Sequence, residues 1–250
     1  MKYSFFDRMG GYVRAHTDRA PSGESRARAA VTISRQAGAG GMSVAHRLAT
    51  YLEDHQRGIT APWEVYDQNA LVEAALEKHR LPAHYAQYLP EDSAPFLHDT
   101  IEDLLGLHPA AGELVRHLAE TMLGLARRGN VILVGRGGNR VAAQLPHVVH
   151  ARLVAPRAVR VRRVEVSCQL SAAAAADFVA RTDRARHRFL RQNFGPGADD
   201  PSAYDITLNT ARLGLDLSAR MLGELVLDRM ASSPKADDEA LLVAHRLSEL

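Results

Sequence analysis

The sequence predicts an α/β protein in which helices flank a parallel β-sheet. Short β-prone runs alternate with longer segments of helical apolar spacing along most of the chain. The strongest run, Val131–Val134, is too short and too apolar for a surface element, and is typical of a strand buried on both faces of a sheet. Glycine-rich turns directly follow two of the runs, as at the carboxyl ends of strands in doubly wound sheets.

Five segments are predicted strands because they are short, apolar and rich in β-prone residues. In chain order they are Ala29–Ile33, Trp63–Tyr66, Val131–Val134, His147–Val154 and Tyr204–Leu208. Strands that alternate with helices in this way are expected to lie parallel in one sheet.

Apolar residues three and four apart predict helices between these strands. The predicted helices are Ser43 to about Gln56, a helix after Asp67 that runs through Leu76, about Ala110–Arg128, about Pro156–Gln169, Ser171–Gln192 and Leu213–Met230. Asp67 and Ser171 are suited to cap helix starts. Residues 80–109 hold four prolines and are expected to form short helices and loops.

The length of 250 residues predicts one domain with two tails. Residues 28–230 form the predicted domain. Residues 1–27 are an N-terminal extension with a candidate short amphipathic helix, and residues 231–250 are a C-terminal tail. The composition, 46% hydrophobic and 24% charged, excludes collagen-like, coiled-coil and wholly disordered chains.

Net charge and cysteine content indicate which partners and which cellular compartment the protein is expected to have. The net charge of +2 makes nucleic acid an unlikely partner. Only three of the 31 basic residues are lysines, and arginine suits phosphate and carboxylate. A single cysteine, Cys168, excludes an internal disulfide framework and a cysteine-built zinc site. With no apolar run long enough for a membrane helix and no export signal, we expect a cytoplasmic protein and no membrane partner.

A glycine cluster follows the first strand, from Ile33 to Ala45. The order strand, glycine-rich turn and helix is the layout of a phosphate-binding loop, because glycines let the backbone approach an anion and the helix start supplies N–H donors. A tight strand-to-helix turn without a ligand is the alternative. The strict P-loop pattern fails here, since Gly41 stands in the lysine position and Arg35 in the first glycine position.

Two further patterns are candidates for anion binding. Arg136 lies in the glycine-rich turn after Val131–Val134, where it either binds phosphate or caps a helix or meets a surface acid. Eight arginines on the two helices after the fourth strand either close over a triphosphate or form a solvated basic face. They are Arg160, Arg162, Arg163, Arg181, Arg184, Arg186, Arg188 and Arg191.

Other signals are weaker. Seven histidines between residues 46 and 117 appear scattered, without a ligand-like pair on one helix. Glu113 and His117 are interpreted as an ordinary helical salt-bridging pair. Asp99, Glu102 and Asp103 are either metal ligands or a solvated face.

With these motifs the chain resembles the cytidylate kinase-like family, a branch of the P-loop nucleoside monophosphate kinases, over roughly residues 29–230. The matching segments are Ile33–Gln36, Gly38–Gly41, Val65–Asp67, Val134–Gly137, Arg160–Arg163, Asp183–Arg186, Phe189, Phe194–Gly195 and Tyr204–Thr210. Each segment is short, but their order and spacing together are specific. The resemblance implies a five-stranded parallel sheet flanked by helices, a monophosphate-binding region and a mobile lid at about residues 157–191.

The resemblance also implies site residues, with ATP and Mg²⁺ as cofactors. The donor-phosphate loop would comprise Gly38, Ala39, Gly40, Gly41, Met42 and Ser43, and the Ser43 hydroxyl would bind Mg²⁺. Arg160 and Arg163 match lid arginines. The substrate-binding candidates are Asp67, Arg136, Asp183 and Arg186.

The sequence departs from a true cytidylate kinase at Gly41, where the family pattern has a lysine that reaches the β- and γ-phosphates. Losing one preorganised donor costs about 3–4 kcal/mol of transition-state stabilisation. Many members of this look-alike family also have glycine without lysine. Arg35 is a candidate to supply the missing charge, and a structural pairing of Arg35 with Asp67 is the alternative.

These observations predict a phosphotransferase that moves the ATP γ-phosphoryl to a nucleoside monophosphate, with CMP as the first candidate. In this chemistry positioning and charge stabilisation carry the rate, so arginines and backbone amides matter more than a general base. The alternative is a nucleotide-binding or regulatory module with weak or no turnover. The sequence does not indicate an oligomeric state.

Overall fold

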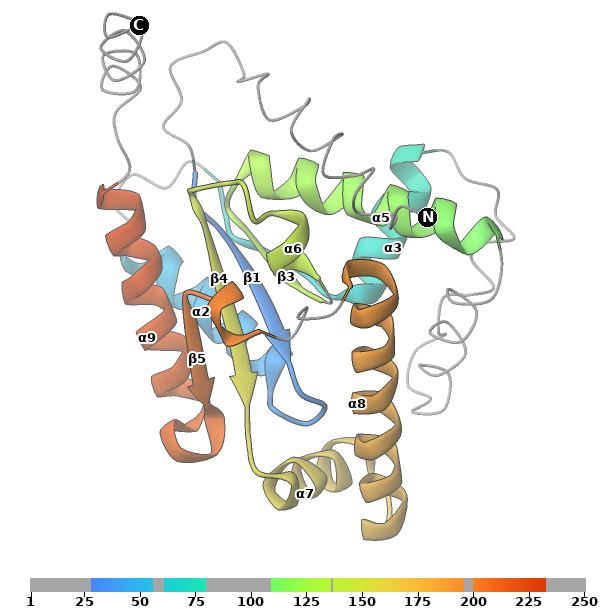
Figure 1. Ribbon diagram of the computed structural model, residues 1–250. Helices are drawn as coiled ribbons and strands as arrows, with labels where there is room; N and C mark the ends of the chain where they lie inside the picture. The colour runs from blue at the N-terminus through green and yellow to red at the C-terminus, as the bar shows by residue number, and fades with distance from the viewer. Residues whose placement is uncertain (1–27, 56–60, 80–108, 136, 196–199, 233–250) are drawn as a thin grey trace, which may run out of the picture.

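The computed structural model describes residues 28–55, 61–79, 109–135, 137–195 and 200–232 (Figure 1). The helix expected in residues 1–27, the loops and short helices expected in 80–108, and the tail from 233 lie outside the described residues. The acidic candidates Asp99, Glu102 and Asp103 lie outside them too.

A five-stranded sheet forms the centre of the described chain, and every pair of neighbouring strands is parallel. The strands are β1 (Ala30–Arg35), β2 (Glu64–Tyr66), β3 (Val131–Val134), β4 (Val148–Val154) and β5 (Ile206–Asn209). Their order in the sheet is β2-β3-β1-β4-β5. The five-stranded parallel sheet predicted from the sequence is therefore confirmed, and β1 lies at its centre.

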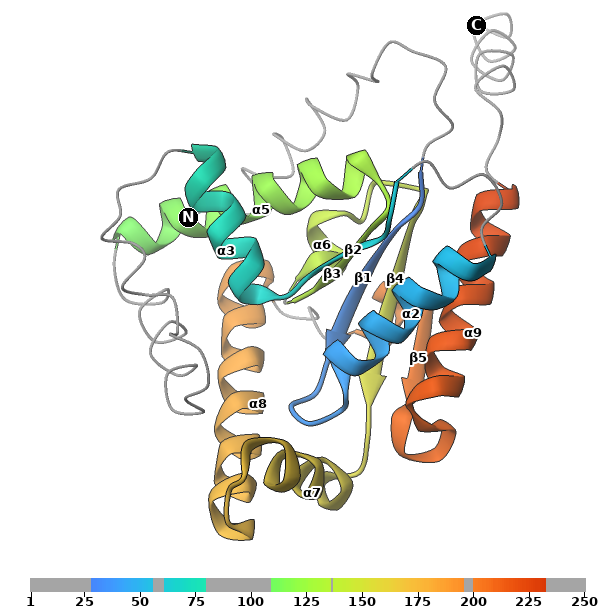
Figure 2. The same ribbon diagram turned by 180° about the vertical axis from the view of Figure 1, so that it is seen from behind.

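Helices cover both faces of the sheet (Figures 1 and 2). Helices α2 (Gly41–His55) and α9 (Thr210–Ser232) pack side by side on one face, and α5 (Pro109–Arg128) and α6 (Gly138–Val141) lie on the other. Helix α3 (Gln68–His79) follows β2 and packs against α5. None of the described helices is both long and apolar enough to cross a membrane.

Two helices lie at the carboxyl end of the sheet. Helix α7 (Arg157–Cys168) follows β4, and the long helix α8 (Ala172–Phe194) returns from it toward β3, with the short 3-10 turn η2 (Pro201–Ala203) before β5. This pair occupies the segment in which the sequence predicts a helical lid.

The core explains why the central strands are continuously apolar. In β3, Ile132 and Val134 pack in the cluster with α2 and α9, whereas Val131 and Leu133 pack in the cluster with α5 and α6. Successive side chains of a strand point to opposite faces, so a strand covered on both sides needs apolar residues at every position.

Local signals place the helix starts. The Asp67 carboxylate accepts a hydrogen bond from the Ala70 N–H (2.8 Å), and the Ser171 hydroxyl accepts one from the Ala174 N–H (3.3 Å), so both predicted caps are confirmed. Helix α6 was not predicted, because its four residues continue a glycine-rich turn. Helix α9 begins at Thr210 rather than at Leu213 and has a non-helical residue at Gly214.

Candidate functional site

A cavity of about 210 Å³ lies between the carboxyl ends of the central strands and helix α8. Its lining comes from β1 and the residue after it, the turn after β3, strand β4, helix α8 and the segment before β5. The lining residues are Ser34, Arg35, Gln36, Gly135, Arg152, Asp183, Arg186, His187, Leu190 and Tyr204. Three arginines and a histidine face a single carboxylate there, so the cavity is suited to an anion.

Arg35 and Arg186 are the central pair of this cavity. The Nη1 atom of Arg35 and the Nε atom of Arg186 are buried without a hydrogen-bond partner. The hydrogen bond that links the two residues runs from Arg186 Nη1 to the Arg35 carbonyl oxygen (3.2 Å). Within the described part of the chain, no carboxylate lies at ion-pair distance from the Arg35 guanidinium. Each of these two neighbouring guanidinium groups therefore has an N–H donor that makes no hydrogen bond to the protein.

The pKa values of the two guanidinium groups reflect this environment. Burial, followed by the charge of Arg186, holds the pKa of Arg35 well below its usual value. Burial lowers the pKa of Arg186 to about 10, and the charge of Arg160 adds to this while Asp183 opposes it. Arg186 therefore stays protonated at neutral pH. A bound anion would relieve the cost of keeping these charges away from water.

The glycine loop lies beside this cavity, between β1 and α2. Gly38 and Gly40 have φ values of +74° and +84°, which side chains other than glycine rarely adopt. A Cβ on Gly38 would come within 2.5 Å of the Arg160 carbonyl oxygen, and one on Gly40 within 2.6 Å of Leu215 Cδ2. The loop glycines thus allow α7 and α9 to pack against the loop.

The first turn of α2 presents N–H groups and the positive end of the helix dipole. Gly41 is buried there, Met42 is half-buried and Ser43 is exposed. The expected donor-phosphate residues from Gly38 to Ser43 are thus contiguous around one helix start. None of them is among the residues that line the 210 Å³ cavity, whose lining includes Ser34, Arg35 and Gln36 just before them.

Arg35 and Gly41 depend on one another. A Cβ on Gly41 would lie 3.0 Å from Arg35 Cγ, 3.3 Å from Cδ and 3.5 Å from Nε. The stem of Arg35 therefore crosses the place from which a lysine side chain at position 41 would start. Arginine at 35 and lysine at 41 would compete for the same space.

The expected lid residue Arg160 is a structural clamp in this conformation. Its Nε donates to the Ala155 carbonyl (2.9 Å), and its Nη1 donates to the Ala37 carbonyl (3.1 Å) and to the Asp183 carboxylate (2.6 Å). Asp183 also accepts a hydrogen bond from the Ala37 N–H (2.8 Å). Together these bonds join α7, α8 and the start of the glycine loop.

Arg163 binds the start of α9. Its Nη1 and Nη2 atoms donate to the hydroxyl and the carbonyl of Thr210, both at 2.9 Å. The Thr210 hydroxyl in turn donates to the Ala39 carbonyl in the glycine loop (2.8 Å). The two lid arginines therefore reach the glycine loop through protein partners.

The sequence-predicted residues divide into two groups. Arg35, Asp183 and Arg186 line one cavity; the resemblance implies a common role for Asp183 and Arg186, and Arg35 is the candidate for the missing lysine. Asp67 caps α3 and is absent from that lining, although its charge acts on Arg35. Arg136 lies outside the described residues.

Sequence reasoning assigned no role to Arg152 and Tyr204. The Arg152 guanidinium lies 5.5 Å from the centroid of the Tyr204 ring, in cation–π contact, at the wall of the cavity. An arginine inside the strand β4, which is mostly apolar, was a signal that could have pointed to this position.

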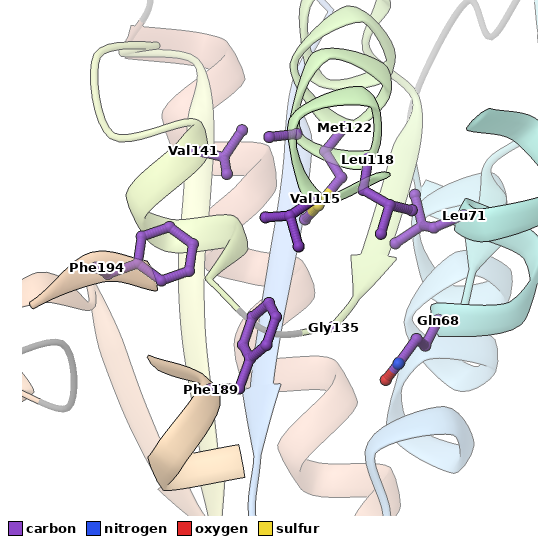
Figure 3. A pocket seen from close by; sticks show the side chains of 10 residues that line it. Gln68, Leu71, Val115, Leu118, Met122, Gly135, Val141, Phe189 and Phe194 are labelled. Atoms are coloured by element: carbon purple, nitrogen blue, oxygen red, sulfur yellow. The ribbon is translucent and has the colours of Figure 1, made fainter. Parts of the chain in front are cut away.

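A second, apolar cavity of about 50 Å³ adjoins the first, since Gly135 lines both (Figure 3). It lies between α3, α5, α6 and the end of α8. Its other lining residues are Gln68, Leu71, Val115, Leu118, Ala119, Met122, Val141, Phe189 and Phe194. The Gln68 side-chain oxygen is buried there without a hydrogen-bond partner. A flat apolar group that carries one N–H donor fits this lining.

Comparison with known families identifies the family to which this fold belongs. The model described as the cytidylate kinase-like family matches residues 30–212, which include all five strands, the glycine loop and both lid helices. The chain belongs to the cytidylate kinase-like family. Its sheet, flanking helices and lid helices are those of a P-loop nucleoside monophosphate kinase fold, as the sequence predicts.

Two solved structures of low sequence identity are similar to this chain. An uncharacterized protein from Eubacterium ventriosum is 17% identical, covers 80% of this chain and 98% of its own, and superposes with a TM-score of 0.57. The shikimate kinase from Bacteroides thetaiotaomicron is 14% identical, with 79% and 98% coverage and a TM-score of 0.46. No curated protein matches the chain.

Proposed function

We propose that this cytidylate kinase-like protein is a phosphotransferase that moves the γ-phosphoryl of ATP to a nucleoside monophosphate, with CMP as the first candidate. The observation that carries the proposal is the pair Arg35 and Arg186. Their buried, unpartnered nitrogens line a cavity beside the N-terminus of α2. Unused cationic donors at this edge of a parallel sheet are suited to phosphate.

The donor triphosphate is proposed to bind the loop from Gly38 to Ser43. The first-turn N–H groups of α2 would hydrogen-bond its β- and γ-phosphates. These residues fit Mg²⁺ as well, because Ser43 presents an exposed hydroxyl at the helix start. When bound, Mg²⁺ would neutralise charge on the phosphate oxygens.

Arg35 is proposed to replace the lysine that Gly41 lacks. Its stem lies against Gly41, and its Nη1 atom has no protein partner, so the charge is close to the helix start that the triphosphate would face. Because a guanidinium binds phosphate oxygens through two parallel N–H groups, it can hold the transferring group as well as neutralise it.

The acceptor is proposed to bind with its phosphate in the 210 Å³ cavity, where Arg186 would donate to the phosphate oxygens and Arg136 is a further candidate. Its base would enter the adjoining apolar cavity, in which the unpartnered Gln68 oxygen accepts one N–H bond. The 4-amino group of cytosine is such a donor.

Arg160 and Arg163 are proposed to act on the transferring phosphoryl after the lid moves. Both guanidinium groups are engaged by protein oxygens in this conformation, and Arg160 is buried. A catalytic contact therefore requires exchange of those oxygens for phosphate oxygens, which are charged and so accept more strongly than the neutral oxygens of Ala155, Ala37 and Thr210.

The experiment that tests the proposal is a coupled assay of ADP release with ATP and Mg²⁺, screened over nucleoside monophosphates. We expect turnover with CMP, and lower turnover with purine monophosphates. Tight ATP binding without ADP release for any acceptor would instead support a nucleotide-binding module. Gly41 in the lysine position favours that second function. Absence of both binding and turnover would overturn both.

A further inference from the structure

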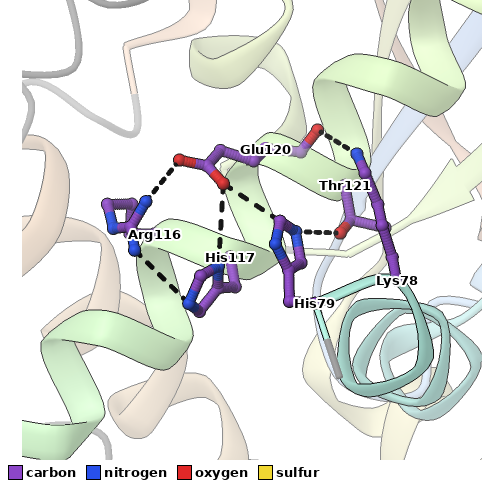
Figure 4. Close-up of polar contacts among 6 residues, drawn as sticks. All are labelled: Lys78, His79, Arg116, His117, Glu120 and Thr121. Carbon is purple, nitrogen blue, oxygen red and sulfur yellow. Dashed lines mark hydrogen bonds and ion pairs between the residues drawn. The ribbon is translucent and has the colours of Figure 1, made fainter. Parts of the chain in front are cut away.

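The interface between α3 and α5 brings together metal-ligating side chains that are far apart in the sequence (Figure 4). His79 is the last residue of α3, and His117 and Glu120 lie on α5. One ligand atom from each of the three falls within 4.8 Å of the others. The three side chains are only 11–17% exposed. The interpretation of these histidines as scattered, and of His117 as a partner of Glu113, did not anticipate this cluster.

The donor set is that of zinc. Two imidazoles and one carboxylate form a three-ligand zinc site in which water completes a tetrahedron. The Glu120 Oε2 atom lies 3.6 Å from His117 Nδ1 and 3.8 Å from His79 Nε2. Ligand atoms bound to one Zn²⁺ at about 2.0–2.1 Å are separated by roughly 3.3 Å, so the two distances from Glu120 need to contract by about half an ångström or less. The ligand nitrogens of the two imidazoles lie within 4.8 Å of each other and need to approach as well.

We propose that His79, His117 and Glu120 form a Zn²⁺ site that joins α3 to α5. The proposal is independent of the phosphotransferase function, because none of the three residues lines either cavity. From Gln68, which lines the apolar cavity, to His79 is about 16 Å along α3. The role of such a site is therefore to hold the end of α3 on α5.

Neighbouring residues prepare the carboxylate for this role. Arg116 Nη1 donates to Glu120 Oε1 (2.7 Å), which turns the second oxygen, Oε2, toward the two imidazoles. Outer hydrogen bonds of this kind orient ligands in metal sites. The buried hydroxyl of Thr121 lies 3.4 Å from His79 Nε2, at the edge of the cluster.

Binding of a metal to His117 Nδ1 requires that the ring proton of His117 moves from one nitrogen to the other. Arg116 Nη2 lies 3.3 Å from His117 Nε2, which makes Nε2 the acceptor and leaves the ring proton on Nδ1. When Nδ1 binds the metal, that proton moves to Nε2 by exchange with water, and Arg116 Nη2 turns away from the ring. The Arg116 side chain is 43% exposed, so it has space to turn while Nη1 stays on Glu120.

The test is a titration of the chelator-treated full chain with ZnCl₂, followed by calorimetry and by thermal unfolding. We expect one tightly bound equivalent and a rise in the unfolding midpoint. Both are expected to be lost in His79→Ala and in Glu120→Gln, which keeps the size of the side chain. The bound equivalent and the rise in midpoint are both expected to remain in the control His46→Ala, which changes an exposed histidine on α2.

Absence of a tightly bound equivalent of zinc in the wild type, or unchanged zinc binding in both site variants, overturns the proposal.

A second measurement does not depend on the folding of any variant. Crystals of the wild-type protein soaked in ZnCl₂ are expected to give an anomalous peak at the zinc edge between His79 Nε2, His117 Nδ1 and Glu120 Oε2. Zinc peaks only at other side chains would overturn the proposal.

Discussion

At the scale of single residues, Arg35 is the most informative side chain. A cation whose Nη1 is buried without a partner costs folding free energy unless it serves a ligand. A side chain at position 41 would require the stem of Arg35 to shift by a few tenths of an ångström. Glycine at position 41 and arginine at position 35 are therefore compatible without such a shift.

Replacing Arg35 separates a ligand-binding role from a structural one. We expect Arg35→Ala to weaken ATP binding or turnover by about 1.5–3 kcal/mol, the range for a charge-assisted hydrogen bond. The unfolding midpoint should stay level or rise, because a partnerless buried donor is removed. Isothermal titration with ATP and a melting curve measure the two effects. Arg47→Ala, which removes an exposed arginine paired with Asp216, is the control. A folded Arg35→Ala protein with full affinity and turnover would contradict this role.

His150 gives the protein a pH-dependent stability. It lies on β4 with its Nδ1 2.7 Å from the Thr32 hydroxyl, and it faces Asp205 and Arg229. Burial lowers the pKa of His150 below 6.5, and Asp205 only partly offsets this. As the pH falls below about 6.5, the unfolded chain therefore takes up a proton before the folded one does, and the free energy of unfolding decreases.

The variant His150→Asn keeps a polar atom near Thr32 but does not titrate. We expect its unfolding midpoint to fall less than that of the wild type between pH 7 and pH 5. Melting curves at several pH values measure the difference, with His46→Asn on the exposed face of α2 as the control. Parallel curves for wild type and His150→Asn would show that His150 is not the source.

Residue identities were predictable where the local pattern demanded them. Asp67 and Ser171 cap helices because short polar side chains before an apolar periodic run have few other uses. Arg152, His79 and His117 were not recognised as site or cluster members. Their neighbours come from distant segments, and no local spacing encodes a contact made only by packing.

At the scale of elements, α7 and α8 are held to the glycine loop by a few polar bonds. The clamp of Arg160, Asp183 and Ala37 and the bonds of Arg163 to Thr210 are all to groups that phosphate oxygens can replace as acceptors. A small apolar cluster of Ala37, Val164, Ala175 and Val179 adds to them. An element attached in this way is suited to open and close.

We expect the segment from about Arg157 to Arg191 to change its hydrogen-exchange protection when nucleotides bind. Saturating ATP and CMP should protect α7 and the first half of α8 more than either nucleotide alone, because both phosphates are needed to draw the arginines in. Exchange followed by mass spectrometry measures this, with peptides from α9 beyond Gly214 as the internal control. Identical protection with and without nucleotides would contradict a lid.

The elements themselves were predicted because their patterns are local. All five strands and the long described helices follow from apolar periodicity and caps. The four-residue α6 was missed because a single helical turn has no periodicity to detect, and its left-handed Gly137 is typical of a turn.

At the scale of the whole molecule, the cation-lined cavity is a source of ligand-dependent stability. We expect inorganic phosphate to raise the unfolding midpoint, since a ligand at 100 times its dissociation constant adds about 2.7 kcal/mol to the free energy of unfolding. This corresponds to roughly 5–10 °C for a domain of this size. The rise should be smaller in Arg186→Met, and unchanged in Arg47→Met on the exposed face of α2.

Phosphate also stabilises proteins through exclusion from their surface, and that general effect is common to all three proteins. Only the difference in midpoint shift between wild type and Arg186→Met measures phosphate binding in the cavity. Equal shifts in these two proteins would mean that the cavity does not bind phosphate.

The parallel arrangement of the whole sheet was predictable, because strands joined by helices need crossovers. The shape of the cavities was not. It depends on how α8 packs across the ends of β1 and β3, and on the burial of Arg35 against Arg186, which are long-range consequences of the fold.

The central place of β1 in the sheet also sets when the protein can fold. Ala30 pairs with Val131 on one side and with Val148 on the other, so both neighbours of β1 lie more than 100 residues further along the chain. The ribosome must finish β3 before β1 can pair with it, and must finish β4 before β1 can pair on its other side. β1 is the first strand to be synthesised, so it stays unpaired for longer than the other strands. Its non-local pairing makes folding slow. Nascent chains of this protein therefore expose β1 as a target for chaperones through much of synthesis.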